Sequence, residues 1–522
     1  MLRNAPEKVY SWLDSLQDYL EARSQLLNIL VPFAFFILTL LWMPVRTNLS
    51  FDTDEGQELI KAILYSRGFA LYHEIWSDQP PLLTICLSAW FKLFGASIFS
   101  GRLLVLCFAT LLIWSFFKTL QISVGSPLAL VGTGLLALSG NFLRMSVSVM
   151  IGLPALSLVT LSIYTLTLYF NSLSLSYLLL SGAAFAVSLQ FKTFAVFLIP
   201  LILFFIFSNS LSTLKSPDAS PSFIQKGRLR ARKIKALNFK NKALKGTILS
   251  GLWLLAFVLT FCVIELTLGS WQLNSTFKFH VNENLKNVFV KENSILDVSW
   301  MLLQDFDLVL LAGLGVGTIL QKKEKWNLFP LAWLATATLM LLNHKPLWYH
   351  HYLLLSIPLV WLASYGVKVA ISEGQRLRKQ AIIFCSLCAI AIPIKLGVIQ
   401  WQNSIFLAES QEKTEVIRRV TQYQQQTHWL FTDNPIYAFQ ANLRVPPEIA
   451  VLSRKRVAAG EMTHDYLYAL FEKYQPEQVI LERFPEVYEP LKPYLEANYV
   501  KVEESGARRH FVKRSLLSKS FL

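Results

Sequence analysis

Apolar segments long enough to cross a lipid bilayer recur along this chain, and they constrain its fold more than any other feature. A helix needs roughly 17–25 apolar residues to span the hydrocarbon core. Because lipid offers the backbone no hydrogen-bond partners, helices are the expected spanning element. Only 16% of the residues are charged, whereas a soluble protein carries about a quarter. The chain is therefore predicted to be a polytopic α-helical membrane protein.

About eleven spans are predicted from these apolar runs. They are residues 26–44, 101–120, 127–143, 153–170, 176–190, 194–208, 247–267, 300–320, 327–342, 352–370 and 380–401. Residues 1–26 carry Tyr10 and several leucines at helical spacing among charges, which predicts an amphipathic interfacial helix. Segment 81–95 is short and contains Lys92, so we expect it to lie in the interface without crossing.

The net charge of +15 is concentrated in loops between predicted spans. The densest basic run, 226–245, falls within loop 209–246, and shorter runs occupy 322–325 and 376–379. If the N-terminus is cytoplasmic and 81–95 does not cross, all three runs are cytoplasmic, as the positive-inside rule expects. This pattern argues against a nucleic-acid partner and is compatible with contacts to membrane lipids.

The same topology places four loops and the C-terminal portion on the outer side of a plasma or inner membrane. The loops are 46–95, 144–152, 268–299 and 343–351. The membrane domain is predicted to cover residues 27–403, with the first outer loop, 46–95, containing interfacial helices.

Residues 404–522 have the composition of a soluble domain. Strands are predicted in the stretches "HWLFTD", "EQVILE" and "RRHFVKR", and helices near 411–426 and 463–474. We therefore expect a small α/β domain on the outer side of the membrane.

Four of the acidic residues in the first outer loop are candidates for chemistry, and three of them stand close to the end of the first span. Asp52, Asp54 and Glu55 precede a predicted helix, and Asp78 stands before a Pro-Pro pair. Acids at a helix start can simply cap it, and Asp78 could be a turn residue. One capping acid suffices, however, so a cluster of three also suggests catalysis.

Two isolated cations stand at span ends on the same side, Arg144 in "NFLRMS" and Lys192 in "LQFKTF". Long basic side chains often extend from a span to the interface without further function. The positive-inside rule does not call for cations on the outer side, so anion binding is the alternative.

The stretch "NHKPLWYHH" joins two spans on this side and concentrates histidines. Its candidate anion-binding residues are His344, Lys345, Tyr349, His350 and His351. Imidazoles with carboxylates can also bind a divalent metal. The spacing matches no standard zinc motif, so a metal is not favoured and no cofactor is predicted.

Carboxylates and cations on one membrane face suggest displacement chemistry on a phosphate-bearing substrate. A carboxylate can act as general base on an acceptor, and cations can stabilise a phosphate leaving group. A lipid-linked donor could reach such a site through the bilayer. No nucleotide-binding loop of the Walker or GxGxxG type is evident.

The pattern "DTDEGQELIKAILYSRGFALYHEIWSDQPPL", followed by "LQFKTFAVFLIP" and "HKPLWYHHYLLLSIPL", resembles the GT-C membrane glycosyltransferases. The nearest group looks like family 39, which includes protein O-mannosyltransferases and lipid A aminoarabinose transferases. This resemblance covers roughly residues 27–400.

The resemblance implies an inverting transfer of a sugar from a polyprenyl-phosphate donor to a lipid, glycan or protein acceptor. Asp54 would be the base, assisted by Glu55, with Asp52 and Asp78 as supporting acids. The cations and the 344–351 stretch would face the donor phosphate.

The chain departs from its relatives at two positions. Gln79 stands where they often carry a basic residue before the proline, and Gly152 where a second acid is expected. Two alternatives to a glycosyltransferase stay open. The first is a transporter or lipid flippase. Such proteins place charges at mid-span and often contain inverted repeats, whereas the charges here stand at span ends and no repeat is evident. The second is a relative that has lost catalysis and acts as a binding protein.

Overall fold

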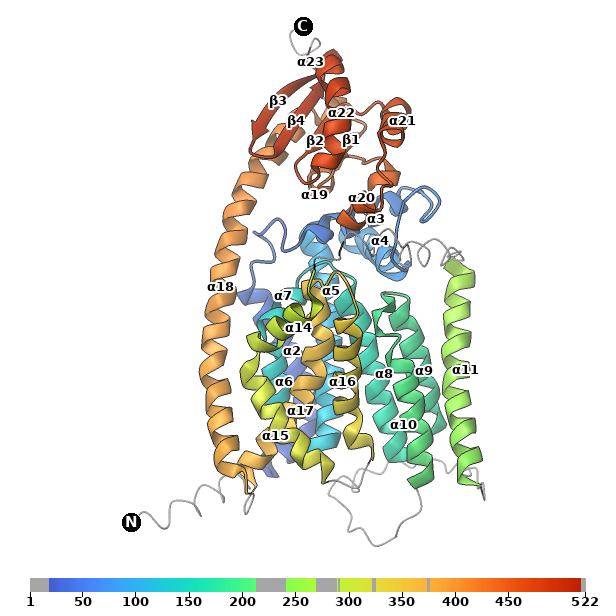
Figure 1. The fold of residues 1–522 in the computed structure, drawn as a ribbon, viewed down its shortest axis with the longest axis vertical. Coiled ribbons are helices and arrows are strands. Elements are labelled where there is room, and N and C mark those ends of the chain that lie inside the picture. The colour runs from blue at the N-terminus through green and yellow to red at the C-terminus, as the bar shows by residue number, and fades with distance from the viewer. Residues whose placement is uncertain are drawn as a thin grey trace.

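The computed structural model describes residues 18–212, 241–268, 289, 292–321, 325–372 and 376–517. Figure 1 shows an elongated molecule, in which a bundle of helices carries a small domain with a β-sheet at one end. The predicted helix over 1–26 and the basic loop 209–246 fall mostly outside the described residues.

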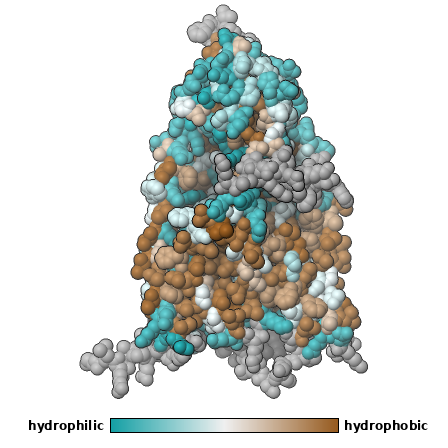
Figure 2. Space-filling model, in the orientation of Figure 1, coloured by the Kyte–Doolittle hydropathy of each residue, from teal (hydrophilic) through white to brown (hydrophobic). Residues whose placement is uncertain are grey.

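Six described helical segments are long and apolar enough to cross a membrane, or seven if one bent pair counts as a span. They are α2 (Ser24–Trp42), α5 (Ile98–Val124), α8 (Gly152–Ser172), α11 (Lys242–Leu268), Tyr349–Ile371, which contains α17 (Leu353–Ile371), and α18 (Arg378–Gln422). The shorter helices α6 (Ser126–Ala137), α9 (Leu175–Leu189), α10 (Leu198–Ser212) and α16 (Phe329–Leu342) pack among them. Figure 2 shows an apolar band across the visible face of the bundle, with hydrophilic side chains over the C-terminal domain. The polytopic helical membrane class is confirmed.

Two predicted spans are broken helices. Segment 300–320 divides at Asp305 into α14 (Ser294–Gln304) and α15 (Phe306–Leu320), which meet at 87°. The side chains of Tyr352 and Lys395 both bind the Asp305 carboxylate, so neighbouring helices satisfy the polar group at the break. Segment 127–143 likewise divides into α6 and the short α7 (Gly140–Met145).

Helices α15 and α17 approach one another closely because glycines face each other. A Cβ atom added to Gly315 would lie 2.0 Å from the Leu362 carbonyl oxygen, and one added to Gly366 would lie equally close to that of Leu311. Small residues of this kind let helix backbones pack closely where lipid provides no hydrophobic drive between them.

Helix α18 corrects the predicted domain boundary at residue 404. The expected span 380–401 and the expected soluble helix near 411–426 form one continuous helix of 45 residues, which is roughly 68 Å long at the rise of an α-helix. Figure 1 shows it running from the far end of the bundle to the C-terminal domain. No glycine or proline interrupts the helix near residue 404, so the helix continues through it. The change in polarity there marks the point where the helix leaves the apolar band.

The C-terminal domain contains a four-stranded sheet in the order β1-β2-β4-β3. Strands β1 (Leu430–Thr432) and β2 (Gln478–Leu481) are parallel, and β4 (Arg508–Lys513) is antiparallel to β2 and to β3 (Tyr499–Ser505). Its helices are α19 (Ile436–Gln440), α20 (Arg454–Ala458), α21 (His464–Tyr474), α22 (Pro485–Asn498) and α23 (Arg514–Leu517). The three predicted strands match β1, β2 and β4, whereas β3 and α22 were not predicted.

Two helices of the first loop lie between the bundle and this domain, namely α3 (Thr53–Ser66) and α4 (Leu82–Phe94). A Cβ atom on Gly56 would come within 2.8 Å of the Ile436 backbone nitrogen, so α3 and α19 are in close contact. Helix α18 begins at the opposite end of the bundle (Figure 1), and the basic run 376–379 extends into its first turn.

Candidate active site

A cavity of about 360 Å³ lies between α3, the ends of the bundle helices nearer the C-terminal domain, and that domain. Charged and polar side chains dominate its wall. The lining residues include Asp52, Asp54, Glu58, Lys61, Asp78, Gln79, Gly152, Lys192, His344, Tyr349, His350, His351, Arg454, Lys455 and Arg483. Segments more than 400 residues apart in the chain thus meet in one site.

Helix α3 presents its acids to the cavity through its capping and its helical period. The Asp52 carboxylate caps the helix by accepting a hydrogen bond of 2.9 Å from the Asp54 N–H. Asp54 and Glu58 are four residues apart and therefore share one helix face. The Lys61 Nζ lies 2.9 Å from a Glu58 carboxylate oxygen, so this face carries both signs of charge.

Glu55 does not line this cavity, and the structure gives it another role. Its carboxylate is fully buried and forms a bidentate pair with Arg102, at 3.0 and 2.8 Å. It also accepts hydrogen bonds from the backbone N–H groups of Phe51 and Val149. Because these four donors occupy both oxygens, Glu55 holds the loop to the bundle. The expectation that Glu55 assists the base is corrected accordingly.

Lys192 and three imidazoles form the membrane side of the cavity. The Lys192 Nζ lies 2.7 Å from the His350 Nε2, and both side chains are buried. The ring of His351 lies close to those of His344 and His350, with centroids 5.1 and 4.5 Å away. Lys192 lies in the α9–α10 connection, and His350 in the turn Tyr349–Tyr352 before α17. The structure thus joins two features that are about 160 residues apart.

Two of the predicted cations lie elsewhere. The Arg144 guanidinium binds the Gln402 side chain of α18 and lies over the rings of Tyr349 and Phe406. Lys345 is exposed and is not among the lining residues. The position of Arg144 suits a role in holding α7 against α18, outside the cavity wall.

Five charged residues of the cavity wall were missed by sequence reasoning: Glu58, Lys61, Arg454, Lys455 and Arg483. The helical spacing from Asp54 could have indicated Glu58 and Lys61. No sequence signal indicates Lys455 or Arg483, because the docking of the C-terminal domain brings them to α3.

Arg483 reaches the cavity on a loop that a buried carboxylate organises. The side chain of Asp433, at the end of β1, accepts hydrogen bonds from the N–H groups of Glu482, Arg483 and Phe484, at 2.7 to 3.1 Å. The Arg483 guanidinium in turn donates to the Asp433 carbonyl oxygen at 3.1 Å.

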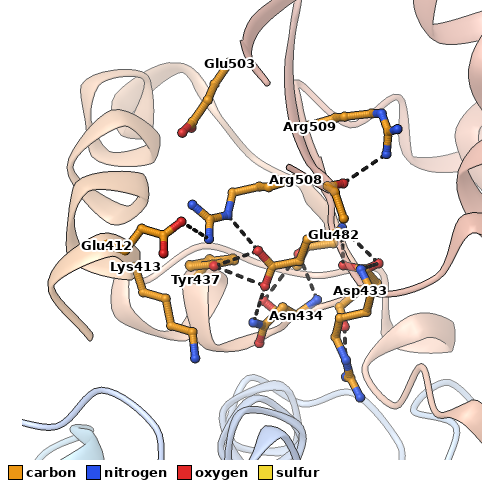
Figure 3. Close-up of polar contacts among 12 residues, drawn as sticks. Glu412, Lys413, Asp433, Asn434, Tyr437, Glu482, Glu503, Arg508 and Arg509 are labelled. Atoms are coloured by element: carbon orange, nitrogen blue, oxygen red, sulfur yellow. Dashed lines mark hydrogen bonds and ion pairs between the residues drawn. The ribbon is translucent and has the colours of Figure 1, made fainter. Parts of the chain in front are cut away.

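The neighbouring Glu482 carboxylate secures the same loop, as Figure 3 shows. It accepts hydrogen bonds from the side chains of Asn434 (2.7 Å), Tyr437 (3.0 Å) and Arg508 (2.7 Å). Arg508 also forms an ion pair of 3.1 Å with Glu412 of α18. The loop that carries Arg483 is therefore tied both to the sheet and to the long helix.

Burial and neighbouring charges shift the protonation of the acids. Burial raises the pKa of Asp54 above its usual range, and the charges of Arg483 and Lys192 oppose that rise. Burial and the nearby Asp54 raise the pKa of Asp52 to about 7. A carboxylate whose pKa is raised binds a proton more readily than an ordinary one, which is a property expected of a general base.

The Lys192 ammonium is affected in the opposite direction. Burial lowers its pKa to about 8, Lys455 adds to the decrease, and Asp54 and Asp78 oppose it. Lys192 is therefore mostly charged at neutral pH and can bind an anion in the cavity.

Gln79 and Gly152, the two departures, both line the cavity. A Cβ atom on Gly152 would lie 4.0 Å from ring atoms of His350 and Phe194, so this position offers space and no carboxylate. Glu58 is the additional buried acid in the wall, and one of its oxygens has no hydrogen-bond partner among the described residues.

The architecture is that of the GT-C membrane glycosyltransferases. The sequence matches the family described as dolichyl-phosphate-mannose-protein mannosyltransferase over residues 78–220, and the predicted resemblance is confirmed. No curated protein matches the chain.

One similar solved structure is ArnT from Cupriavidus metallidurans bound to undecaprenyl phosphate. It has a TM-score of 0.59 and 11% identity, covering 94% of this chain and 98% of that chain. Its apo form has a TM-score of 0.57 at 10% identity, covering 95% and 99%. The archaeal oligosaccharyltransferase AglB from Archaeoglobus fulgidus, in complex with an inhibitory peptide and a dolichol-phosphate, has a TM-score of 0.52 at 12% identity, covering 88% and 70%. At these identities the likeness establishes the fold.

Proposed function

We propose that this protein is an integral-membrane glycosyltransferase that transfers a sugar from a polyprenyl-phosphate donor to a lipid, glycan or protein acceptor. The observation that carries the proposal is the single cavity in which Asp54 faces Lys192 and its imidazole neighbours. Base and anion-binding groups therefore lie within one small volume. The similar fold of proteins whose structures hold undecaprenyl phosphate or dolichol-phosphate supports the same substrate class.

Asp54 acts as the general base in this proposal. Its carboxylate accepts the proton of the acceptor hydroxyl or amine as the acceptor attacks the anomeric carbon. The bond from that carbon to the phosphate oxygen breaks, and its electron pair stays on the phosphate. Attack from the side opposite the phosphate inverts the anomeric centre.

Lys192 binds the donor phosphate and stabilises it as it leaves. Its ammonium can donate hydrogen bonds both to His350 and to a phosphate oxygen. His350 holds the ammonium in place, and both side chains are buried. A fixed charge at a buried site is worth more than it would be in solution.

The cavity lies on the non-cytoplasmic face in this proposal, and the N-terminus is cytoplasmic. The basic run 376–379 extends into the start of α18, at the end of the bundle opposite the cavity. The positive-inside rule assigns that end to the cytoplasm.

The direct test compares Asp54→Asn with the wild type in membranes supplied with labelled polyprenyl-phosphate sugars. Removal of the base should lower the rate of transfer about 10²–10⁴-fold. The control is Asp465→Asn, because Asp465 is fully exposed in the C-terminal domain.

Transfer by Asp54→Asn at the wild-type rate would assign the base to another residue. Binding without transfer in the wild type would favour the relative that has lost catalysis. Movement of the intact lipid across the membrane would favour the flippase.

A further inference from the structure

We propose that Lys455 of the C-terminal domain binds the donor phosphate together with Lys192 and stabilises the phosphate as the sugar leaves. The inference rests on the proposed function and adds a second domain to its active site. It follows from how Lys455 is held, what it faces and how the charge of the phosphate changes during transfer.

The neighbouring Arg456 anchors α20 and thereby positions Lys455. The Arg456 guanidinium is almost fully buried and donates hydrogen bonds to the carbonyl oxygens of Glu448 and Val451. It also forms an ion pair of 2.9 Å with Glu461. The helix that carries Lys455 is thus fixed by contacts that do not involve Lys455 itself.

The same segment is docked on the first outer loop. The Arg456 guanidinium lies 4.4 Å from the centre of the Trp76 ring, and the backbone N–H of Trp76 donates to the Pro447 carbonyl oxygen at 3.3 Å. The Gln57 side chain of α3 donates to the Leu452 carbonyl oxygen at 3.4 Å. These contacts hold Lys455 in the wall of the cavity that Asp54 also lines.

Lys455 and Lys192 line the same partly enclosed cavity from different domains. They are close enough for the charge of Lys455 to lower the pKa of Lys192. Two ammonium groups in such a space repel each other, and a bound anion offsets that repulsion. Asp54 and Asp78 also face this pair, but Asp54 is needed as the base. An external anion between the two lysines therefore suits the arrangement.

The charge of a lipid-linked phosphate makes the second lysine useful during transfer. In the donor the phosphate is a diester with one negative charge. When the bond to the sugar breaks, the electron pair remains on the phosphate oxygen and the group becomes a monoester with a second charge. The second cation therefore stabilises the transition state more than the bound donor, which is the condition for raising kcat.

The experiment uses the full chain in nanodiscs with Lys455→Met, Lys455→Arg and the control Lys501→Met. Lys501 lies in the same domain and pairs with Glu504 on its exposed face. Lys455→Met should lower kcat about 10–100-fold, the loss typical of a hydrogen bond to a charged group. The donor KM should rise less, and Lys455→Arg should recover most of the activity.

The pH dependence of the transfer rate provides a readout that a purely structural defect would not change. The groups that influence the Lys192 ammonium are Lys455, Asp54, Asp78, Glu58 and His350. Removing the Lys455 charge should raise the pKa of Lys192. The loss of activity at alkaline pH should therefore begin at a higher pH in Lys455→Met than in the wild type.

Binding of polyprenyl monophosphate and of inorganic phosphate separates the two sources of this anion. We expect Lys455→Met to weaken binding of the polyprenyl monophosphate about 10–100-fold and Lys501→Met to leave it unchanged. A wild type that binds only inorganic phosphate through Lys455 would overturn the inference. So would Lys455→Met with wild-type kcat and lipid binding.

Failure of the proposed function would look different. The wild type itself would then neither bind polyprenyl monophosphate nor transfer sugar from any polyprenyl-phosphate donor.

Discussion

The two walls of the cavity are built in different ways. On the membrane side, Lys192 and His350 are buried and hydrogen bonded to each other. On the C-terminal side, Lys455 and Arg483 are only partly buried, and their backbones are held by neighbouring residues such as Asp433. The membrane wall is thus organised through its functional side chains, whereas the C-terminal wall is organised through the segments behind them.

This difference predicts different responses to substitution. A change in the membrane wall alters a buried charge and its direct partner, which costs much in a low-dielectric site. A change in the C-terminal wall alters a partly solvated charge, which water screens. The largest effects are therefore expected on the membrane side.

Of the substitutions in these two walls, Lys192→Met should give the largest loss of activity. We expect kcat/KM for the lipid-linked donor to fall about 10²–10³-fold, the range found when one stabilising donor is removed from an active site. The measurement is the initial rate of sugar transfer in nanodiscs at several donor concentrations. Lys473→Met is the control, because Lys473 is exposed on the C-terminal domain. Equal losses in the two variants would contradict a specific role for Lys192.

Gly56→Leu should separate the two walls without changing any charge. The new side chain would collide with the Ile436 backbone, and overpacking of this kind costs about 1–3 kcal/mol. We expect transfer to fall about tenfold or more, together with faster proteolysis at the edge of the C-terminal domain.

Gly251→Leu is the matched control for this displacement, because a Cβ atom at Gly251 meets nothing within 4 Å. Normal activity and normal protease resistance in Gly56→Leu would mean that the contact between α3 and α19 is not needed.

Arg483→Gln should have a smaller effect that depends on pH. The charged groups that act on Asp54 are Arg483, Lys192, Asp78 and Lys61, and Arg483 is the strongest of them. Removal of this positive charge raises the pKa of the base further, so activity should be lost at a higher pH as the solution is acidified. Near neutral pH the loss should be only a few-fold, because Arg483 is partly exposed. An acid limb identical to that of the wild type would exclude this role.

The smallest effect is expected for the wild type itself, in the dependence of donor binding on alkaline pH. Burial lowers the pKa of Lys192 to about 8, so donor binding should weaken as the pH rises through that value and the ammonium loses its proton. The measurement is the donor KM between neutral and alkaline pH. A donor KM that stays constant well above pH 8 would show that Lys192 does not contact the phosphate as an ammonium.

The sequence was sufficient for features that depend on local pattern. Apolar runs predicted the helices of the bundle, and alternating residues predicted β1, β2 and β4, since burial on one face imposes these periods. A short helix beside the first span was also predicted, directly after Asp54 and Glu55. The break at Asp305 was not predicted, because it depends on Tyr352 and Lys395 from other helices.

What the tertiary structure decided is which charged groups meet. Asp54 and Glu55 are adjacent and look equivalent in the sequence, but the helix turns one toward the cavity and the other toward Arg102. Lys455 and Arg483 have no distinctive local pattern, and they reach the site only because α18 carries a folded domain back onto α3. Local sequence specifies the period and polarity of each element, whereas a charge is assigned its partner only when distant segments pack together and exclude water.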